Sequence, residues 1–364
     1  MSGVFGMNIK MSIYGESHGR SIGVVLDGLP PGLALDEEAI AKEMARRAPG
    51  QSALTTARKE SDAVEIQSGF FNGFTTGTPL CARIANSDQH SKDYSILQDK
   101  MRPGHADYAG HVRYQGFNDY RGGGHFSGRL TAPLVFAGAV AKQALAQYGV
   151  LVGAHILRIS DIEDAAFDPM GMTDAELLAL QAKAFPVLDD AAGEKMQRRI
   201  LQAKGDLNSV GGVVEAMSLH LPAGVGAPYF DSVESRLSHG LFSVPAVKGV
   251  EFGDGFGFAG LTGAEANDEL HYDGGQVRAL TNHNGGVTGG ITNGMPLVLR
   301  AALKPTPSIS RQQRTVSLKE KSDTTLTIVG RHDPCIVQRA VPVIEAVVAW
   351  NLWDLILEAK KWEK

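Results

Sequence analysis

Arginine, histidine and aspartate stand within six positions of one another in the stretch MRPGHADY, as Arg102, His105 and Asp107. The Pro103-Gly104 pair between them predicts a turn, so these side chains are expected on a loop. A cation, a proton carrier and a carboxylate on one loop can bind an anion and move a proton. A solvated Arg102–Asp107 ion pair beside an incidental histidine would give the same string, so other motifs must decide.

A second polar triplet lies near the N-terminus, in YGESHG at 14–19. Glycine on both sides frees the backbone and exposes Ser17 and His18. His18 is a candidate proton donor, since the ordinary pKa of histidine lies near neutral pH. A polar turn is the alternative. Ser17 as the nucleophile of a hydrolase is disfavoured, because the chain has no G-x-S-x-G elbow.

Three further motifs carry positive charge. DYRGGGHFSGRLT at 119–131 is a glycine-rich turn that leads into a helix, where free N–H groups favour an anion and Ser127 and Arg129 add contacts. It is neither a P-loop nor a GxGxxG motif. KPTPSISR begins with Lys304, and GRHDPC contains Arg331, His332 and Asp333. With Arg47, these motifs predict a cationic site for small ligands that carry phosphates and carboxylates.

The composition excludes several classes of protein. The chain has 364 residues, a net charge of −5 and two cysteines. A mildly acidic chain is a poor candidate for general nucleic-acid binding, and two cysteines suit a reducing cytoplasm. No apolar run reaches ~18 residues and no signal-peptide pattern is present, so we expect no membrane span. Without HxxxH or CxxC spacing, we expect no metal site.

The elements that must position these motifs alternate between strand and helix. The pattern predicts a strand at 22–26 and then a helix capped by Asp36. It predicts antiparallel β-structure over 62–86, a small-residue helix over 127–149 and an amphipathic helix over 339–364.

Two segments of the chain predict the same order of elements. The segments 23–40 and 212–233 each predict a strand, a Leu-Pro-x-Gly turn and a helix, and each leads into a β-like stretch. We interpret this as an internal duplication, with chance similarity of so short a match as the alternative. A polar helical stretch at 157–210, with a capping box from Thr173 to Glu176, is interpreted as an insertion.

Six motifs, five of them described above, resemble those of chorismate synthases in the same order: YGESHG, MRPGHADY, YRGGG…SGR…TA, NHNGGVTGGITNG, KPTPSI and GRHDPC…RAVPVIEA. The resemblance implies an α+β fold, a β-α-β sandwich with an internal pseudo-two-fold duplication. It further implies one domain over 1–364, with pseudo-repeats near 10–150 and 205–355 around the insertion. A cytoplasmic homotetramer that binds reduced FMN is expected on the same ground.

The activity implied by the resemblance is the 1,4-anti elimination of phosphate from 5-enolpyruvylshikimate 3-phosphate to give chorismate. This is a carbon–oxygen lyase reaction of the shikimate pathway, which supplies the aromatic amino acids. It needs reduced FMN without net redox change. The resemblance leaves open whether NADPH reduces the FMN on this protein or a separate flavin reductase does.

Individual roles also follow from the resemblance. His18 aligns with the histidine that protonates the departing phosphate, His105 with the one that interacts with the reduced flavin, and Asp333 with the carboxylate that accepts a proton from flavin N5. The implied substrate contacts are Ser17, Arg47, Arg102, Ser127, Arg129 and Arg331. The implied FMN contacts are His125, Phe126, Ser127, Ala246, Asn284, Lys304, Pro305, Thr306, Pro307, Ser308 and Arg331, and Arg47 is also an implied NADP contact.

Two departures from the family pattern affect these expectations. The family usually has Arg-Ser-Ser-Ala-Arg-Glu-Thr where this chain has HFSGRLT from His125, and Ala53 replaces a frequent arginine. His125 is only partly charged at neutral pH, and the Phe126 side chain donates no hydrogen bond. We therefore expect weaker FMN binding or a rearranged site. A paralogue that binds flavin or shikimate-type ligands with impaired turnover is the alternative, whereas a purely structural module fits these cationic loops poorly.

Overall fold

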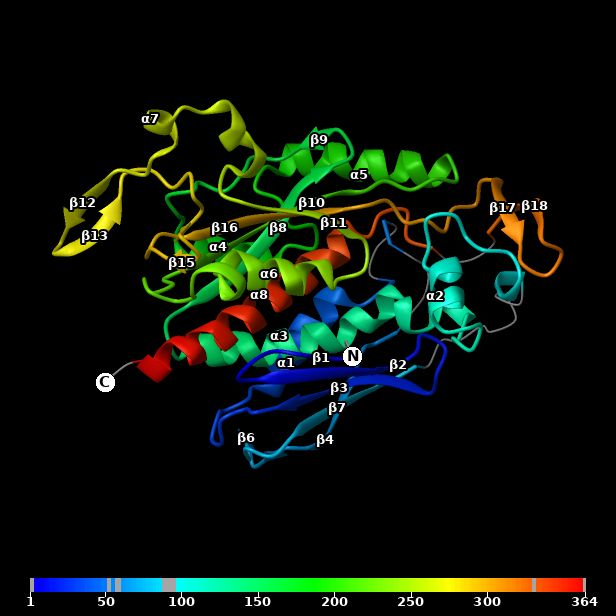
Figure 1. Cartoon of the computed structure of the whole chain (residues 1–364), viewed down its shortest axis with the longest axis horizontal. Coiled ribbons are helices and arrows are strands. Elements are labelled where there is room, and N and C mark those ends of the chain that lie inside the picture. Colours follow the sequence, from blue (N-terminus) through cyan, green and yellow to red (C-terminus); the bar gives the residue numbers. More distant parts are fainter. Residues whose placement is uncertain (1–2, 51–53, 56–59, 87–95, 329–331, 363–364) are drawn as a thin grey trace.

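The chain folds in three layers, with helices between two antiparallel sheets, in the computed structural model (Figure 1). The structure describes residues 3–50, 54–55, 60–86, 96–328 and 332–362. One sheet has the strand order β1-β2-β3-β7-β4 and the other has the order β11-β16-β10-β8-β9. The predicted β-α-β sandwich of the α+β class is therefore confirmed.

The first sheet comes from the N-terminal part of the chain. Its strands are β1 (Val4–Phe5), β2 (Lys10–Gly15), β3 (Ser21–Asp27), β4 (Val64–Ser68) and β7 (Leu80–Ala85). The central strand β3 buries Ile22, Val24 and Leu26 completely, because alternate side chains of a strand share one face. The short strands β5 (Phe70–Phe71) and β6 (Phe74–Thr75) complete the β-structure predicted over 62–86.

The second sheet comes from the later part of the chain. Its strands are β8 (Leu151–Ile159), β9 (Ile162–Glu163), β10 (Gly212–Leu219), β11 (Val247–Phe252) and β16 (Leu297–Leu303). The first residues of the predicted insertion thus belong to β8, and its helices are α4 (Asp174–Ala182) and α5 (Asp190–Gly205). The predicted capping box at Thr173 and Glu176 is confirmed. Figure 1 shows α5 on the face of this sheet that points away from the helical layer.

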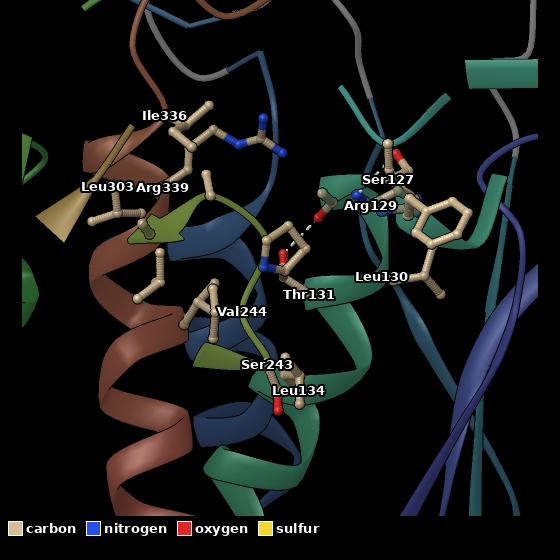
Figure 2. Close-up of a pocket in the computed structure, with 18 of the residues that line it drawn as sticks. Ser127, Arg129, Leu130, Thr131, Leu134, Ser243, Val244, Leu303, Ile336 and Arg339 are labelled. Atoms are coloured by element: carbon tan, nitrogen blue, oxygen red, sulfur yellow. Dashed lines mark hydrogen bonds between the residues drawn. The ribbon is translucent and has the colours of Figure 1, made fainter. Parts of the chain in front are cut away.

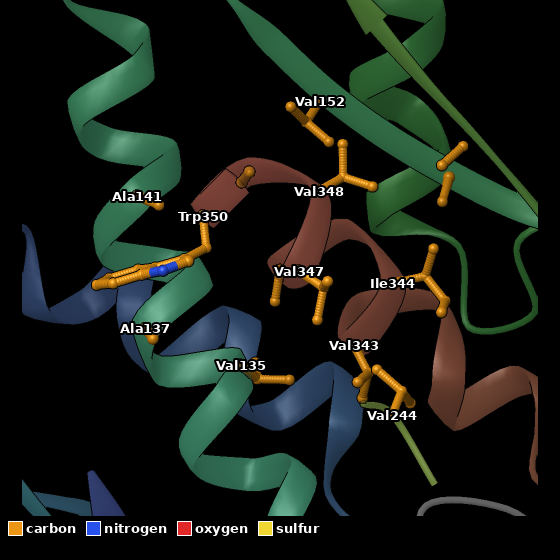
Figure 3. Close-up of a cluster of buried hydrophobic side chains, with 14 of the residues drawn as sticks. Val135, Ala137, Ala141, Val152, Val244, Val343, Ile344, Val347, Val348 and Trp350 are labelled. Carbon is orange, nitrogen blue, oxygen red and sulfur yellow. The ribbon is translucent and has the colours of Figure 1, made fainter. Parts of the chain in front are cut away.

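Four helices fill the middle layer. They are α1 (Glu37–Arg47), α3 (Thr131–Ala146), α6 (Val233–Phe242) and α8 (Val337–Ala359). The two longest, α3 and α8, pack so closely that a Cβ added at Gly138 would lie 2.1 Å from the Cβ of Ala346. Figure 3 shows Ala137 and Ala141 of α3 beside Trp350 of α8 in this core. Small residues at this crossing therefore let the two helix backbones approach.

The helix ends refine the sequence predictions. Asp36 caps α1 as predicted, accepting hydrogen bonds from the backbone N–H groups of Glu38 (2.9 Å) and Ala39 (3.0 Å). The small-residue helix begins at Thr131 rather than 127, because Ser127 caps a separate 3₁₀ turn over Gly128–Leu130. The C-terminal helix spans 337–359 rather than 339–364.

The two sheets repeat one topology. The order β2-β3-β7-β4 in the first sheet corresponds to β8-β10-β16-β11 in the second. In chain order, α1 and α6 take matching places between these strands, and α3 and α8 follow them. This correspondence supports the internal duplication. The single-domain reading and the repeat bounds near 10–150 and 205–355 stay predictions.

Smaller elements surround the sandwich. They are α2 (Asp107–Arg113), α7 (Gly263–Ala266) and the strand pairs β12 (Leu270–Asp273) with β13 (Gln276–Ala279), β14 (Val287–Thr288) with β15 (Ile291–Thr292), and β17 (Gln313–Ser317) with β18 (Ser322–Leu326). Within the described part of the chain, α8 alone is long and apolar enough to cross a membrane. Because 94% of its apolar window is buried inside the fold, this is weak evidence for a span.

Candidate active site

A cleft of about 720 Å³ opens where α1 ends and α3 and α8 begin. Figure 2 shows Ser243 and Val244, from the segment between α6 and β11, lying between the starts of α3 and α8. Most predicted site residues line this cleft: Arg47, Arg102, His105, His125, Phe126, Ser127, Arg129, Ala246, Lys304, Thr306, Pro307, Ser308 and Asp333. The fold thus gathers motifs that lie far apart in the sequence.

Other predicted residues lie off this lining. Ser17 and His18 are buried behind the loop of Gly122, Gly123 and Gly124, called the glycine loop below. Pro305 borders a different hollow. Asn284 is held away, because its backbone N–H and its Nδ2 both donate to Oδ2 of Asp268, at 3.0 and 2.8 Å. The structure therefore does not bring this implied FMN contact into the cleft. Arg331 and Ala53 lie outside the described residues.

The glycine loop separates the two predicted catalytic histidines. Gly122, Gly123 and Gly124 all have positive φ, at 58°, 87° and 55°, a conformation that L side chains rarely adopt. A Cβ at Gly122 would lie 2.2 Å from Cε1 of His18, and a Cβ at Gly123 would lie 3.0 Å from Cε1 of His105. Both imidazoles therefore rest directly against the loop backbone, which only glycine allows.

Arg102 and Asp107 form a buried pair that holds His105. Asp107 accepts from the Arg102 backbone N–H (3.0 Å), from Nε (2.7 Å) and from Nη2 (2.7 Å). Oδ1 of Asp107 also lies 2.6 Å from Nδ1 of His105. Burial raises the pKa of Asp107, but hydrogen bonds from Arg102 and His105 outweigh it and hold that pKa well below its usual range. The stretch is therefore neither a solvated ion pair nor an incidental histidine.

This pair also joins two motifs. Arg102 Nη1 donates to the hydroxyl of Ser308 at 3.2 Å. Lys304 Nζ donates a hydrogen bond to the carbonyl oxygen of Gly104. The backbone N–H of Lys304 donates to the carbonyl oxygen of Ala246 at 3.0 Å. The KPTPSI segment is thus fixed against the RPGHAD turn and against the start of β11.

Arg47 and Arg129 meet at a carboxylate that the sequence interpretation missed. Nη1 of Arg47 lies 2.5 Å from Oδ2 of Asp62, and Nη1 of Arg129 donates to Oδ1 of the same side chain. Glu60 adds a second ion pair with Nε of Arg129, at 3.0 Å. All four side chains are buried. The only sequence signal is indirect: buried arginines need buried counter-charges.

Asp333 is also held by an arginine that was not predicted. Arg339, in the first turn of α8, donates to Asp333 Oδ2 at 2.6 Å and to the carbonyl of Arg47 at 3.1 Å. Beside Asp333, burial and the cation of Arg102 lower the pKa of His332 to about 4. His332 therefore lines the cleft as a neutral imidazole at neutral pH.

His125 and Phe126, which depart from the family pattern, each make specific contacts. Nδ1 of His125 lies 2.8 Å from the carbonyl oxygen of Gly15, which ties the loop to the end of β2. The ring of Phe126 packs 6.1 Å from the ring of Tyr114 and fits against Gly110, where a Cβ would come within 2.6 Å. Both side chains still line the cleft.

Comparisons with known proteins agree on one family. A family model for chorismate synthase matches residues 9–357. Chorismate synthases from Thermococcus gammatolerans and Dehalococcoides mccartyi are each 46% identical to this chain, covering 98% and 99% of it and 98% of their own length. A solved structure described as "Crystal Structure of Chorismate Synthase" superposes with a TM-score of 0.76 at 29% identity, over 97% of this chain and 93% of that one. The chain therefore belongs to the chorismate synthase family.

Proposed function

We propose that this chain eliminates phosphate from 5-enolpyruvylshikimate 3-phosphate to form chorismate, as a carbon–oxygen lyase acting on phosphates that requires reduced FMN. The observation that carries the proposal is the convergence of cations and His105 on one cleft, with His18 buried against the glycine loop that lines it. A dianionic leaving group needs positive charge and an acid; the cleft supplies the positive charge, and His18 behind the glycine loop is the proposed acid. Cytoplasmic localisation and a homotetramer belong to the same proposal.

The cleft fits a flavin with an anionic substrate. Its volume of about 720 Å³ lies within the range of ligand sites. Its lining includes the apolar side chains of Phe5, Ile13, Leu134 and Val343, which suit a planar ring system. Its lining also includes the cations Arg47, Arg102, Arg129 and Lys304, which suit phosphate and carboxylate groups. When bound, reduced FMN supplies electron density that assists phosphate loss and is recovered as the ring hydrogen departs.

The residues proposed to hold FMN come from three segments around the cleft. They are His125, Phe126, Ser127, Ala246, Lys304, Thr306, Pro307 and Ser308, with Asn284, Pro305 and Arg331 as further predicted contacts. Arg47 as an NADP contact, with NADPH as the reductant, and a separate flavin reductase remain alternative proposals for how FMN is reduced.

The chain's own groups have distinct roles in the proposed reaction. Arg47, Arg102 and Arg129 orient the substrate and balance its charge, which holds it in a reactive position. His18, with Ser17 beside it, delivers a proton to the departing phosphate. On the other side of the glycine loop, His105 is fixed by Asp107 through the 2.6 Å contact, so that its free edge faces the loop.

Asp333 is the proposed proton acceptor. Its carboxylate accepts the proton that is released as the ring hydrogen leaves, and Arg339 orients it through the 2.6 Å hydrogen bond. The neutral His332 beside it adds no positive charge that would oppose this uptake. The proposed proton donor, His18, and the proposed proton acceptor, Asp333, thus come from different segments of the chain, so the acid and the base of the elimination are separate groups.

Anaerobic turnover tests the proposal. Purified protein receives 5-enolpyruvylshikimate 3-phosphate and dithionite-reduced FMN, and phosphate release is followed together with chorismate absorbance. We expect both signals to rise together and to vanish with oxidised FMN. Flavin binding without product at any FMN concentration would refute the proposal and favour a paralogue with impaired turnover.

A further inference from the structure

The arrangement of Arg47 and Arg129 raises a question about substrate binding. Three nitrogens of Arg47 already donate inside the protein: Nη1 to Asp62, Nε to Thr131 Oγ1 (3.1 Å) and Nη2 to the carbonyl of Gly128 (3.1 Å). Arg129 uses Nη1 for Asp62 and Nε for Glu60 and for Asn86 Oδ1 (3.1 Å). An incoming anion therefore meets arginines whose charge is already balanced.

The carboxylate of Asp62 lies between the guanidinium groups of Arg47 and Arg129. It is 2% exposed, and each of its carboxylate oxygens is directed at a different arginine. Its φ is +51°, a left-handed conformation that is uncommon outside glycine. Burial raises its pKa, but the charges of Arg47 and Arg129 outweigh that effect, so it stays ionised.

A carboxylate bridging two arginines resembles, in charge and in hydrogen-bonding geometry, a bound phosphate or carboxylate ligand. The 3₁₀ turn Gly128–Leu130 and the first residue of α3 lie close to Arg47, since the Gly128 carbonyl and the Thr131 hydroxyl accept hydrogen bonds from this arginine. Asp62 therefore sits in a setting that suits an anionic ligand, next to a cleft that both arginines line.

From this geometry we infer that Asp62 is an internal counter-anion which competes with the phosphate and carboxylate groups of ligands for Arg47 and Arg129. This inference rests on the proposed use of the cleft. Asp62 neutralises the buried arginines when the cleft is empty, and it weakens the hold of the site on a simple anion such as inorganic phosphate. Polyanionic substrates bind through several groups and are less affected, so Asp62 favours substrate over released phosphate.

The experiment measures binding of inorganic phosphate by calorimetry to the full chain and to Asp62→Asn, which keeps the side chain's shape and removes its charge. Removing a negative charge at this distance should tighten the phosphate dissociation constant roughly tenfold. It should also lower the melting temperature without phosphate and increase the stabilisation that phosphate gives. The matched control is Asp354→Asn, another buried carboxylate, which pairs with Arg236 outside the cleft and should leave phosphate binding unchanged.

A second variant keeps the test decisive if Asp62→Asn folds poorly. Glu60→Gln removes the charge that pairs with Nε of Arg129, and we expect a smaller tightening of phosphate binding in the same direction. Phosphate binding that weakens or stays unchanged in the folded variants would overturn the inference and make Asp62 a positioning residue. Because phosphate binding needs no turnover, this result is distinguishable from failure of the proposed reaction.

Discussion

Gly122 offers the sharpest test of how the fold holds the proposed acid. Its replacement by alanine adds one Cβ, which would lie 2.2 Å from Cε1 and 2.3 Å from Nδ1 of His18. Ordinary Cβ contacts begin near 3.4 Å, so the imidazole must retreat by about 1 Å. His18 is only 4% exposed, so the ring has little open space to move into.

The substitution affects both the stability of the fold and the rate of the reaction, by different amounts. A positive φ costs alanine about 1–2 kcal/mol of stability wherever it occurs. The displacement of His18 acts on the reaction instead, because a 1 Å misplacement of a reacting group lowers rates by about 100-fold. We therefore expect Gly122→Ala to lower kcat about 100-fold and to destabilise the fold only modestly.

The assay is anaerobic turnover with reduced FMN, together with thermal melting. Gly149→Ala is the matched control, since Gly149 also has a positive φ of 72° but nothing within 4 Å of its added Cβ. It should lose stability and keep its kcat. Gly123→Ala, with a 3.0 Å contact to His105, should have an intermediate kcat. A folded Gly122→Ala variant within about threefold of the unaltered kcat would refute this reasoning.

Three further predictions follow from named contacts. Asp107→Asn removes the negative charge and one of the two acceptor oxygens that hold Arg102 and His105. It should lower kcat/KM roughly 10- to 100-fold in steady-state assays, whereas an unchanged value would show that the pair is only structural. The pKa of His332 is lowered from 6.5 to about 4, so between these values the unfolded chain binds a proton that the folded chain does not, and stability falls as the pH drops through this window. The free energy of unfolding, measured by urea denaturation at pH 7 and at pH 4.5, should therefore fall by about 2 kcal/mol less in His332→Gln than in the unaltered protein. Equal decreases in the two proteins would contradict the lowered pKa. Gly138→Ala places a Cβ 2.1 Å from the facing alanine of α8 and should cost about 1–3 kcal/mol in chemical denaturation, with partial recovery when that alanine becomes glycine.

Local elements were largely predictable. The Asp36 cap, the strand at 22–26 and the Thr173 capping box are confirmed, because each depends on residues within a few positions. The start of α3 was wrong by four residues, since Ser127 caps a 3₁₀ turn before the helix begins. A single stretch of sequence does not distinguish these two uses of a serine cap.

The sequence by itself determined the family and the motifs that line the cleft, because each motif is a local string whose residue types carry the chemistry. Only the tertiary structure decided how those charges are balanced. Asp62, between Arg47 and Arg129, and Arg339, on Asp333, were not predicted. The physical reason is that a buried cation needs a counter-charge somewhere within a few ångströms, and the chain supplies it from whichever segment the fold brings there.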